Sequence, residues 1–246
     1  MTTSATDEIF AAWRERRINE GNRVGLHDLY AMVASPRGLA ITDLPIEERT
    51  ELTYRAQAVF WPGYEQVGPA RPFEPVAVVD YDPHWPDVFA SFATRLAACV
   101  GDAALRIEHV GSTSVPGLQA KPIIDVMMSV ADSTNESSYV PGCEAAGLEL
   151  FTRDDVHRFF QVPWPEPRTV QLHVCDIGSD FEDEHLLFRD YLRRHDGIRD
   201  AYGALKDDAA VTWGDDRIGY TYAKNTFILD AIDAARAEQR AGVARD

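Results

Sequence analysis

No stretch of about 18 consecutive apolar residues, the length that a helix needs to cross a membrane, occurs in the sequence. The chain begins Met-Thr-Thr-Ser-Ala-Thr-Asp and shows no apolar core of a secretion signal near this start. We therefore expect a cytoplasmic protein without a membrane partner.

Cysteine is scarce, with 3 residues in a chain of 246, and the spacing is not that of a metal site. Cys99, Cys143 and Cys175 each lie among apolar residues, so we predict that they are buried free thiols. Unpaired thiols fit the reducing conditions of the cytoplasm.

Positive charge is also in short supply. The chain has 24 Lys and Arg residues against 40 Asp and Glu residues, and its net charge is −16. Such a protein repels the phosphate backbone of nucleic acids, so we expect no nucleic-acid partner. A few well-placed Arg and Lys side chains would then hold any anionic ligand, and we expect a small-molecule substrate.

The composition is that of a globular protein, with 45% hydrophobic and 26% charged residues. The length allows one large domain, or a domain with an appendage. Residues 1–75 predict an N-terminal extension, with helices at 6–19, at 26–34 and after Pro45, and a linker rich in Pro and Gly from residue 62. This extension contains no motif, and we expect it to be a brace, a lid or a partner-binding segment.

Residues 76–246 predict the second domain. Its expected strands span 75–81, 105–110, 122–130, 148–152, 157–162 and 169–175. Its expected helices span 82–100, 136–146, 182–195, 198–211 and 217 to the end of the chain. The predicted fold class is therefore α+β, a small mixed sheet flanked by helices, with a helical N-terminal extension.

One stretch, residues 107–126, combines features of a phosphate site and a metal site. Gly111 ends an apolar run and lets the backbone turn close to a ligand. The Ser-Thr-Ser sequence at 112–114 offers hydroxyl and N–H groups to phosphate oxygens. Asp125 lies in the next apolar run, where a carboxylate is unfavourable unless it is paired or binds a metal.

Five segments, in the same order over residues 75–235, together make the chain resemble the GrpB family of the nucleotidyltransferase-fold superfamily. They are residues 81–86 (Tyr-Asp-Pro-His-Trp-Pro), 107–126, 171–174 (Gln-Leu-His-Val), 185–193 (His-Leu-Leu-Phe-Arg-Asp-Tyr-Leu-Arg) and 222–224 (Tyr-Ala-Lys).

The superfamily resemblance implies a twisted sheet on which a Gly-Ser turn binds the triphosphate of ATP or another NTP. It also implies two carboxylates in an Asp-x-Asp spacing and a third on a neighbouring strand, which hold two divalent metal ions, Mg²⁺ or Mn²⁺. One ion activates the attacking oxygen, and the other neutralises the leaving pyrophosphate. The strand period of two places both carboxylates of Asp-x-Asp on one face.

The sequence departs from this pattern at two positions. Asp125 matches the second Asp of the pair, but Ile123 stands at the first, and His173 stands at the neighbouring-strand position. We predict Asp125 and His173 as metal ligands, and Asp125, Glu108 and His173 as catalytic residues. Glu108 and His109 point to opposite faces of their strand, so at most one of them lines the site. One carboxylate and one imidazole supply less negative charge than two Mg²⁺ ions usually receive.

Basic residues could hold the phosphates. Arg189 and Arg193 share one helix face with His185 and predict an anion cradle, although pairing with nearby Asp and Glu residues is the alternative. Lys206 and Lys224 could reach the same place from the C-terminal helices. The predicted nucleotide-binding residues are Gly111, Ser112, Thr113, Ser114, Lys121, Arg189, Arg193 and Lys224. Asp125 has the alternative of a salt bridge to Lys121 or Arg106.

Three hypotheses follow for the function. The first is a nucleotidyltransferase-like protein that binds an NTP and a divalent metal and acts on a small molecule. The second is a non-catalytic module that binds a nucleotide or phosphometabolite, in keeping with the GrpB-like domains that resemble appendages of dephospho-coenzyme A kinase. The third is an ATP-dependent ligase-type transferase that works through an adenylate. The three hypotheses differ on whether the protein is an enzyme. The sequence makes no prediction of the oligomeric state.

Overall fold

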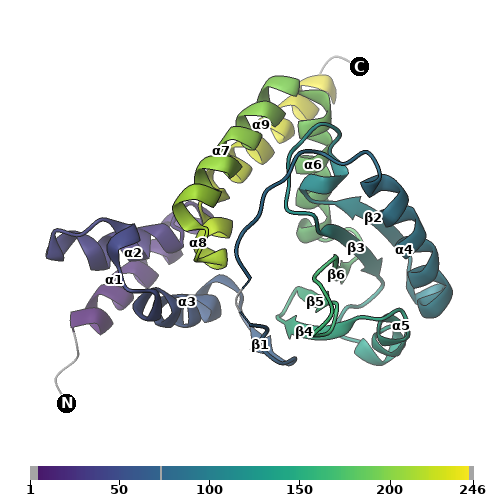
Figure 1. The fold of residues 1–246 in the computed structure, drawn as a ribbon, viewed down its shortest axis with the longest axis horizontal. Coiled ribbons are helices and arrows are strands. Elements are labelled where there is room, and N and C mark those ends of the chain that lie inside the picture. The colour runs from purple at the N-terminus through teal and green to yellow at the C-terminus, as the bar shows by residue number, and fades with distance from the viewer. Residues whose placement is uncertain (1–4, 73, 244–246) are drawn as a thin grey trace.

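A computed structural model describes residues 5–72 and 74–243 (Figure 1). The N-terminal extension folds into three helices, α1 (Ala5–Glu20), α2 (Leu26–Ala34) and α3 (Ile46–Phe60), joined by short 3₁₀ turns. Helix α3 follows Pro45 and has two glutamates in its first turn, where the helix dipole favours negative charge. The helices predicted in the extension are therefore confirmed.

The centre of the fold is a six-stranded mixed sheet with the order β1-β4-β5-β6-β3-β2. Strand β3 runs parallel to β6, and all other neighbouring strands are antiparallel. The strands are β1 (Glu65–Gln66), β2 (Arg106–Val110), β3 (Ile124–Val130), β4 (Glu149–Arg153), β5 (His157–Gln161) and β6 (Val170–Asp176). The predicted α+β class with a mixed sheet is confirmed, and β1 adds an unpredicted short strand from the linker.

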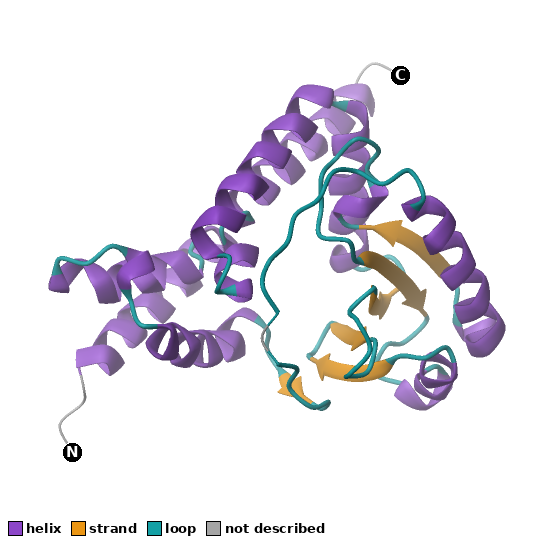
Figure 2. Cartoon of the chain, viewed as in Figure 1, coloured by secondary structure: helices purple, strands orange, loops and turns teal. Residues whose placement is uncertain are grey.

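Helices flank both faces of the sheet (Figure 2). They are α4 (Trp85–Val100), α5 (Val140–Ala145), α6 (Asp180–Arg194), α7 (Asp196–Trp213), α8 (Arg217–Tyr222) and α9 (Asn225–Val243). Alternate residues of β3 face α4 and α5 on one side, where Val126 and Met128 pack against Phe92. Met127, on the other face, packs against Phe181 of α6. Asp125 shares this second face, so its carboxylate points away from the main core.

The extension packs on the C-terminal helices. Trp13, Tyr30 and Leu52 from the first three helices form one buried cluster with Trp213 at the end of α7 and Tyr220 of α8. In Figure 1, helices α1 to α3 lie beside α8 and the end of α7. The extension thus packs on α7 and α8, while its role and the domain boundary near residue 75 remain predictions. No helix in the described ranges is both long and apolar enough to cross a membrane.

Three predicted elements differ in the structure. Residues 75–81 form only an isolated bridge between Val79 and Ala120, because a loop rather than a strand lies beside them. The predicted helix 136–146 is a short 3₁₀ turn followed by α5, with Pro141 in its first turn. The long helix expected from residue 217 breaks between α8 and α9, which turns Lys224 inward. The cysteines are free as predicted, but Cys99 is exposed.

Candidate functional site

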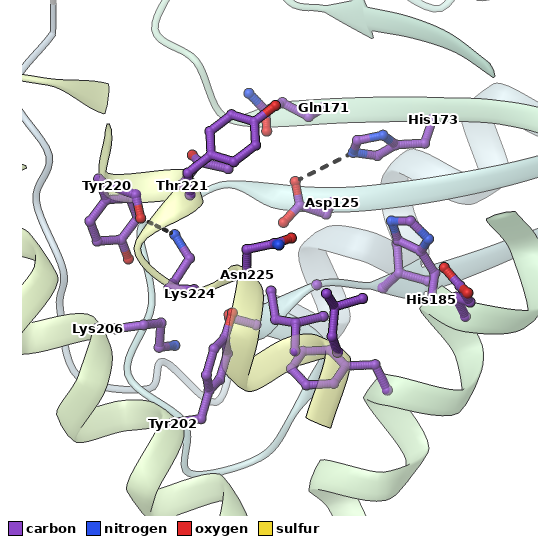
Figure 3. A pocket seen from close by; sticks show the side chains of 18 of the residues that line it. Asp125, Gln171, His173, His185, Tyr202, Lys206, Tyr220, Thr221, Lys224 and Asn225 are labelled. Atoms are coloured by element: carbon purple, nitrogen blue, oxygen red, sulfur yellow. Dashed lines mark hydrogen bonds and ion pairs between the residues drawn. The ribbon is translucent and has the colours of Figure 1, made fainter. Parts of the chain in front are cut away.

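The loop between β2 and β3, residues 111–123, is called the Gly-Ser loop below. A pocket of about 480 Å³ opens where this loop and the first residues of β3 and β6 meet the C-terminal helices. Its walls come from the loop after β2, from the sheet, from α6 to α9 and from the end of α3. Figure 3 shows side chains from several of these elements facing the same space, among them Asp125, His173, Tyr202 and Lys224. The volume is within the range of small-molecule sites.

The Gly-Ser turn lies directly against Asp125. Val110 pairs with Asp125 across β2 and β3, and Gly111 follows with a φ of 68° and a ψ of −173°. A Cβ atom at position 111 would lie 2.2 Å from Oδ2 of Asp125. The sequence motif therefore brings its turn and its carboxylate together, as predicted from the spacing.

The hydroxyl groups of the loop serve different purposes. Ser112 shares a hydrogen bond with the Tyr202 hydroxyl group inside the pocket. Thr113 Oγ1 donates to the Ile123 carbonyl at 3.3 Å, and Ser114 Oγ donates to the Gly111 carbonyl at 2.6 Å. Thr113 and Ser114 thus hold the loop in shape, and Ser114 lies outside the pocket.

Asp125 is a half-buried carboxylate that receives no hydrogen bond from any described residue. Its nearest ionisable partner is His173, whose Nε2 lies 4.0 Å from Oδ1. Burial raises the pKa of Asp125 to about 6, although the surrounding Lys and Arg charges act in the opposite direction. This carboxylate therefore changes charge close to neutral pH.

His173 is a neutral imidazole in a row of polar contacts that continues to His157 and Asp154. Its Nδ1 lies 3.0 Å from Nε2 of His157, and Nδ1 of His157 lies 3.4 Å from Oδ2 of Asp154. Burial lowers the pKa of His173 well below its usual value, so its contact with Asp125 is not an ion pair at neutral pH. His185, which also lines the pocket, has a pKa lowered by burial to about 4.

The pocket contains every lysine of the chain. The whole chain contains three lysines, and all three line this pocket: Lys121 from the loop, Lys206 from α7 and Lys224 from the break before α9. None of them has a carboxylate within 4.0 Å in the described part of the chain. Two carboxylates line the same pocket, Asp125 beside the lysines and Glu184 on α6, and Arg17 lines it as well, so the protonated lysines give the site an excess of positive charge inside an acidic protein.

The lysine amino groups contact neutral partners instead. Lys224 Nζ donates to the Tyr220 carbonyl at 2.8 Å and lies 3.5 Å from the centre of the Tyr220 ring, while Lys206 donates to the Gln119 carbonyl. Lys121 Nζ lies 5.0 Å from the Tyr220 ring on the same side of the site. Burial lowers the pKa of Lys121 to about 8, of Lys206 to about 7 and of Lys224 to about 6. An anion bound here would stabilise their charged forms.

The donor set does not fit the two-metal centre that the superfamily resemblance implies. Within residues 5–72 and 74–243, no three His, Cys, Asp or Glu side chains gather as a metal site would require. Asp125 and His173 supply two ligands at most, and the lysine amines beside them repel a cation. Ile123 lines the pocket at the position where the resemblance places another carboxylate.

Four predicted residues, Glu108, Ser114, Arg189 and Arg193, lie on the other side of the Gly-Ser loop, at a second cavity. Arg189 Nη1 forms an ion pair with Oε2 of Glu108 at 2.7 Å. Arg193 donates two hydrogen bonds to the Ser114 carbonyl, at 3.0 Å and 2.7 Å. Arg189 also pairs with Asp190. The two arginines therefore hold the Gly-Ser loop in place instead of facing the first pocket. Glu108 does not line that pocket, so it does not reach Asp125.

Several pocket residues were not predicted. Tyr202, Tyr220, Gln171 and Asn225 line the site, and the extension contributes Trp61, which shares a hydrogen bond with the hydroxyl of Tyr222. The scarcity of lysine was a signal in the sequence that could have linked positions 121, 206 and 224. The aromatic residues had no such signal, because buried aromatics are common in any core.

Comparison with known proteins places most of the chain in one family. The GrpB protein family matches residues 75–234. A UPF0157 protein of Halalkalibacterium halodurans is 38% identical over 175 residues, which cover 70% of this chain and 88% of that protein. A dephospho-CoA kinase of Mycobacterium tuberculosis is 28% identical over 187 residues, which cover 65% of this chain and 46% of the kinase.

A solved structure supports the same assignment. The crystal structure of the conserved protein GrpB from Enterococcus faecalis superimposes with a TM-score of 0.59 and 31% sequence identity. The match covers 66% of this chain and 99% of that one. The α+β fold, the matched residues 75–234 and the identity to these relatives agree, and the chain belongs to the GrpB family.

Proposed function

We propose that the lysine pocket binds a small molecule that bears phosphate groups, most simply a nucleotide. The observation that supports this proposal is the convergence of Lys121, Lys206 and Lys224 on one pocket. Of the two carboxylates that line it, only Asp125 lies beside the lysines, because Glu184 pairs with Arg236. The Gly111–Ser112 turn would contact the phosphates, as the nucleotidyltransferase resemblance implies.

The physical argument concerns unbalanced charge. Buried ammonium groups are unfavourable when no counter-charge accompanies them. Lys206 and Lys224 are 2% and 7% exposed, and a net charge of −16 on the chain gives no general reason for a positive pocket. A phosphate ligand would supply the missing negative charge and hydrogen-bond acceptors. The similarity to part of a dephospho-CoA kinase is compatible with a ligand of the nucleotide class.

Calorimetry with ATP, in the presence and absence of Mg²⁺, tests this binding. We expect saturable binding to the full chain, and at least a tenfold weaker affinity for Lys224→Gln. Arg16→Gln is the matched control, because it removes one positive charge from an exposed position on α1. Absence of binding by the wild type, or equal affinities for the two variants, would contradict the proposal.

Nucleotidyl transfer is a second candidate, favoured by the state of Asp125. A carboxylate with a pKa of about 6 that accepts no hydrogen bond from the described residues suits a general base near neutral pH. It would take the proton of an attacking hydroxyl group as the new oxygen–phosphorus bond forms and pyrophosphate leaves, while the lysines neutralise the phosphates.

Pyrophosphate release from labelled NTP, with a pool of small-molecule acceptors and with added Mg²⁺ or Mn²⁺, tests this second candidate. We expect Asp125→Asn to retain ATP binding and to lose release. ATP binding without any pyrophosphate release by the wild type would leave the non-catalytic binding module as the function.

A further inference from the structure

Three arginines from distant parts of the chain meet around one glutamate. Arg71 Nη2 lies 3.0 Å from Oε1 of Glu74, while Arg168 Nε and Arg217 Nη1 lie 3.4 Å and 3.9 Å from Oε2. Arg71 and Glu74 belong to the linker, Arg168 precedes β6, and Arg217 begins α8. One carboxylate thus faces three guanidinium groups, which leaves an excess of two positive charges.

The hydrogen bonds of this arginine cluster (Arg71, Arg168 and Arg217) are incomplete. Arg71 donates to the carbonyl groups of Val162 and Glu166, at 2.6 Å and 2.8 Å, and so holds the linker on the sheet domain. Arg168 Nε, although it lies 3.4 Å from Oε2 of Glu74, and Arg217 Nη2 are buried and form no hydrogen bond with any residue that the structure describes. Unpaired buried donors are unfavourable, so these two arginines lack acceptors that a bound anion would provide.

The cluster adjoins the lysine pocket. Thr169, next to Arg168, accepts a hydrogen bond from the backbone N–H of Ile124 at 2.9 Å, and Ile124 precedes Asp125. Arg217 lies one turn before Tyr220, which lines the pocket. The positive charges of Arg217 and Arg168 contribute to the lowered pKa of Lys121, in agreement with this proximity.

We propose that Arg168 and Arg217 form a second anion subsite, which binds the distal phosphate of the ligand whose other phosphates contact the lysines. This inference rests on the proposed function and adds to it the length of the ligand. A guanidinium group suits a terminal phosphate, because it can donate two parallel hydrogen bonds. The ligand class is therefore a compound with an extended phosphate chain rather than a monophosphate.

Glu74 competes with the ligand in this arrangement. It is 31% exposed, and its arginine partners hold its pKa below the usual value against the effect of burial. Its negative charge would repel a phosphate that approaches Arg168 or Arg217. Removal of this charge should therefore tighten the binding of a long phosphate chain.

Calorimetry of the full chain with orthophosphate, pyrophosphate and tripolyphosphate tests the subsite. We expect Arg168→Gln and Arg217→Gln to weaken tripolyphosphate binding at least tenfold and to leave orthophosphate binding unchanged. Arg217→Lys should retain part of the affinity, and Glu74→Gln should raise the affinity for tripolyphosphate severalfold. Arg16→Gln again serves as the control for the loss of one positive charge, and thermal unfolding shows which variants are folded.

Two outcomes separate this inference from the proposed function. If Lys224→Gln weakens all three probes but Arg168→Gln, Arg217→Gln and Glu74→Gln match the control, the arginine cluster is a structural clamp and the subsite is wrong. If the wild type binds none of the three probes, the proposed function fails together with the subsite.

Discussion

The Cα atom of Gly111 lies so close to the Asp125 carboxylate that a methyl group at this position would sit 2.2 Å from Oδ2. The backbone at Gly111 also has a φ of 68°, in a region that residues with a side chain rarely adopt. Two independent constraints therefore require glycine, one from the backbone and one from the carboxylate.

Gly111→Ala should destabilise the protein and abolish anion binding. Backbone strain would lower the free energy of unfolding by about 1–3 kcal/mol, and displacement of Asp125 adds about 1–3 kcal/mol of overpacking. Gly101→Ala is a matched control, because Gly101 has a φ of 69° and a ψ of −142°, and no atom of the described residues lies within 4 Å of a Cβ there. Equal losses of stability in the two variants, measured by urea unfolding, would show that the contact with Asp125 does not matter.

Anion affinity should fall as the pH rises from 6 to 8.5. The lysines lose their protons as the pH passes their pKa values, about 6 for Lys224, 7 for Lys206 and 8 for Lys121, and Asp125 gains a negative charge above about 6. Sulfate is the suitable probe, since its own charge is constant in this range. Calorimetry in buffers of different ionisation enthalpy should show proton uptake on binding. A flat or rising affinity would rule out the lysines as the binding groups.

Lys224→Met should stabilise the unliganded protein while it removes anion binding. The folded-state pKa of Lys224 is about 6 and its ordinary value is 10.5, so the buried lysine opposes folding at neutral pH. The loss of folding free energy caused by Lys224 is greatest below pH 6, where the lysine is charged in both states, and it vanishes above pH 10.5, where the lysine is neutral in both. The gain in stability should therefore be larger at pH 6 than at pH 9. We expect a gain of about 0.5–2 kcal/mol at pH 7. A loss of stability at all pH values would indicate that Lys224 is a structural residue.

A buried ion pair joins the extension to the C-terminal helices, next to the apolar cluster. Arg49 Nη1 of α3 lies 2.9 Å from Oδ2 of Asp216, with side chains 5% and 8% exposed, and Asp216 also caps α8. Arg49→Met should lower the free energy of unfolding by about 3–5 kcal/mol, because it leaves Asp216 buried without its partner. Arg37→Met breaks a more exposed pair with Glu48 and should cost about 0–1 kcal/mol. Chemical denaturation of both variants checks the difference.

Much of the fold could be predicted from local patterns. Apolar runs bounded by Gly and Pro predicted β3 and β6, and the Gly-Ser turn next to Asp125 followed from the order of strand, loop and strand. The strand predicted at residues 75–81 was wrong. This apolar segment lies beside a loop, so it has no neighbouring strand with which to form a hydrogen-bonded ladder, whatever its local β propensity.

The candidate site was less predictable, since its parts meet over long distances in the sequence. Glu108 and Arg189 are 81 positions apart and pair with each other, which removes both from the pocket. Lys206 enters the site because α7 packs on the Gly-Ser loop through Tyr202, a tertiary contact that no short pattern encodes. The arginine cluster likewise joins the linker, the start of β6 and α8.

The confinement of every lysine to one pocket has a practical consequence. The side-chain amines of this protein all open into the same cavity, and their lowered pKa values leave them partly unprotonated, hence nucleophilic, near neutral pH. Amine-selective acylation of the lysines is therefore a site-directed modification without any mutation. The rate of labelling of each lysine becomes a direct measure of whether the pocket is occupied.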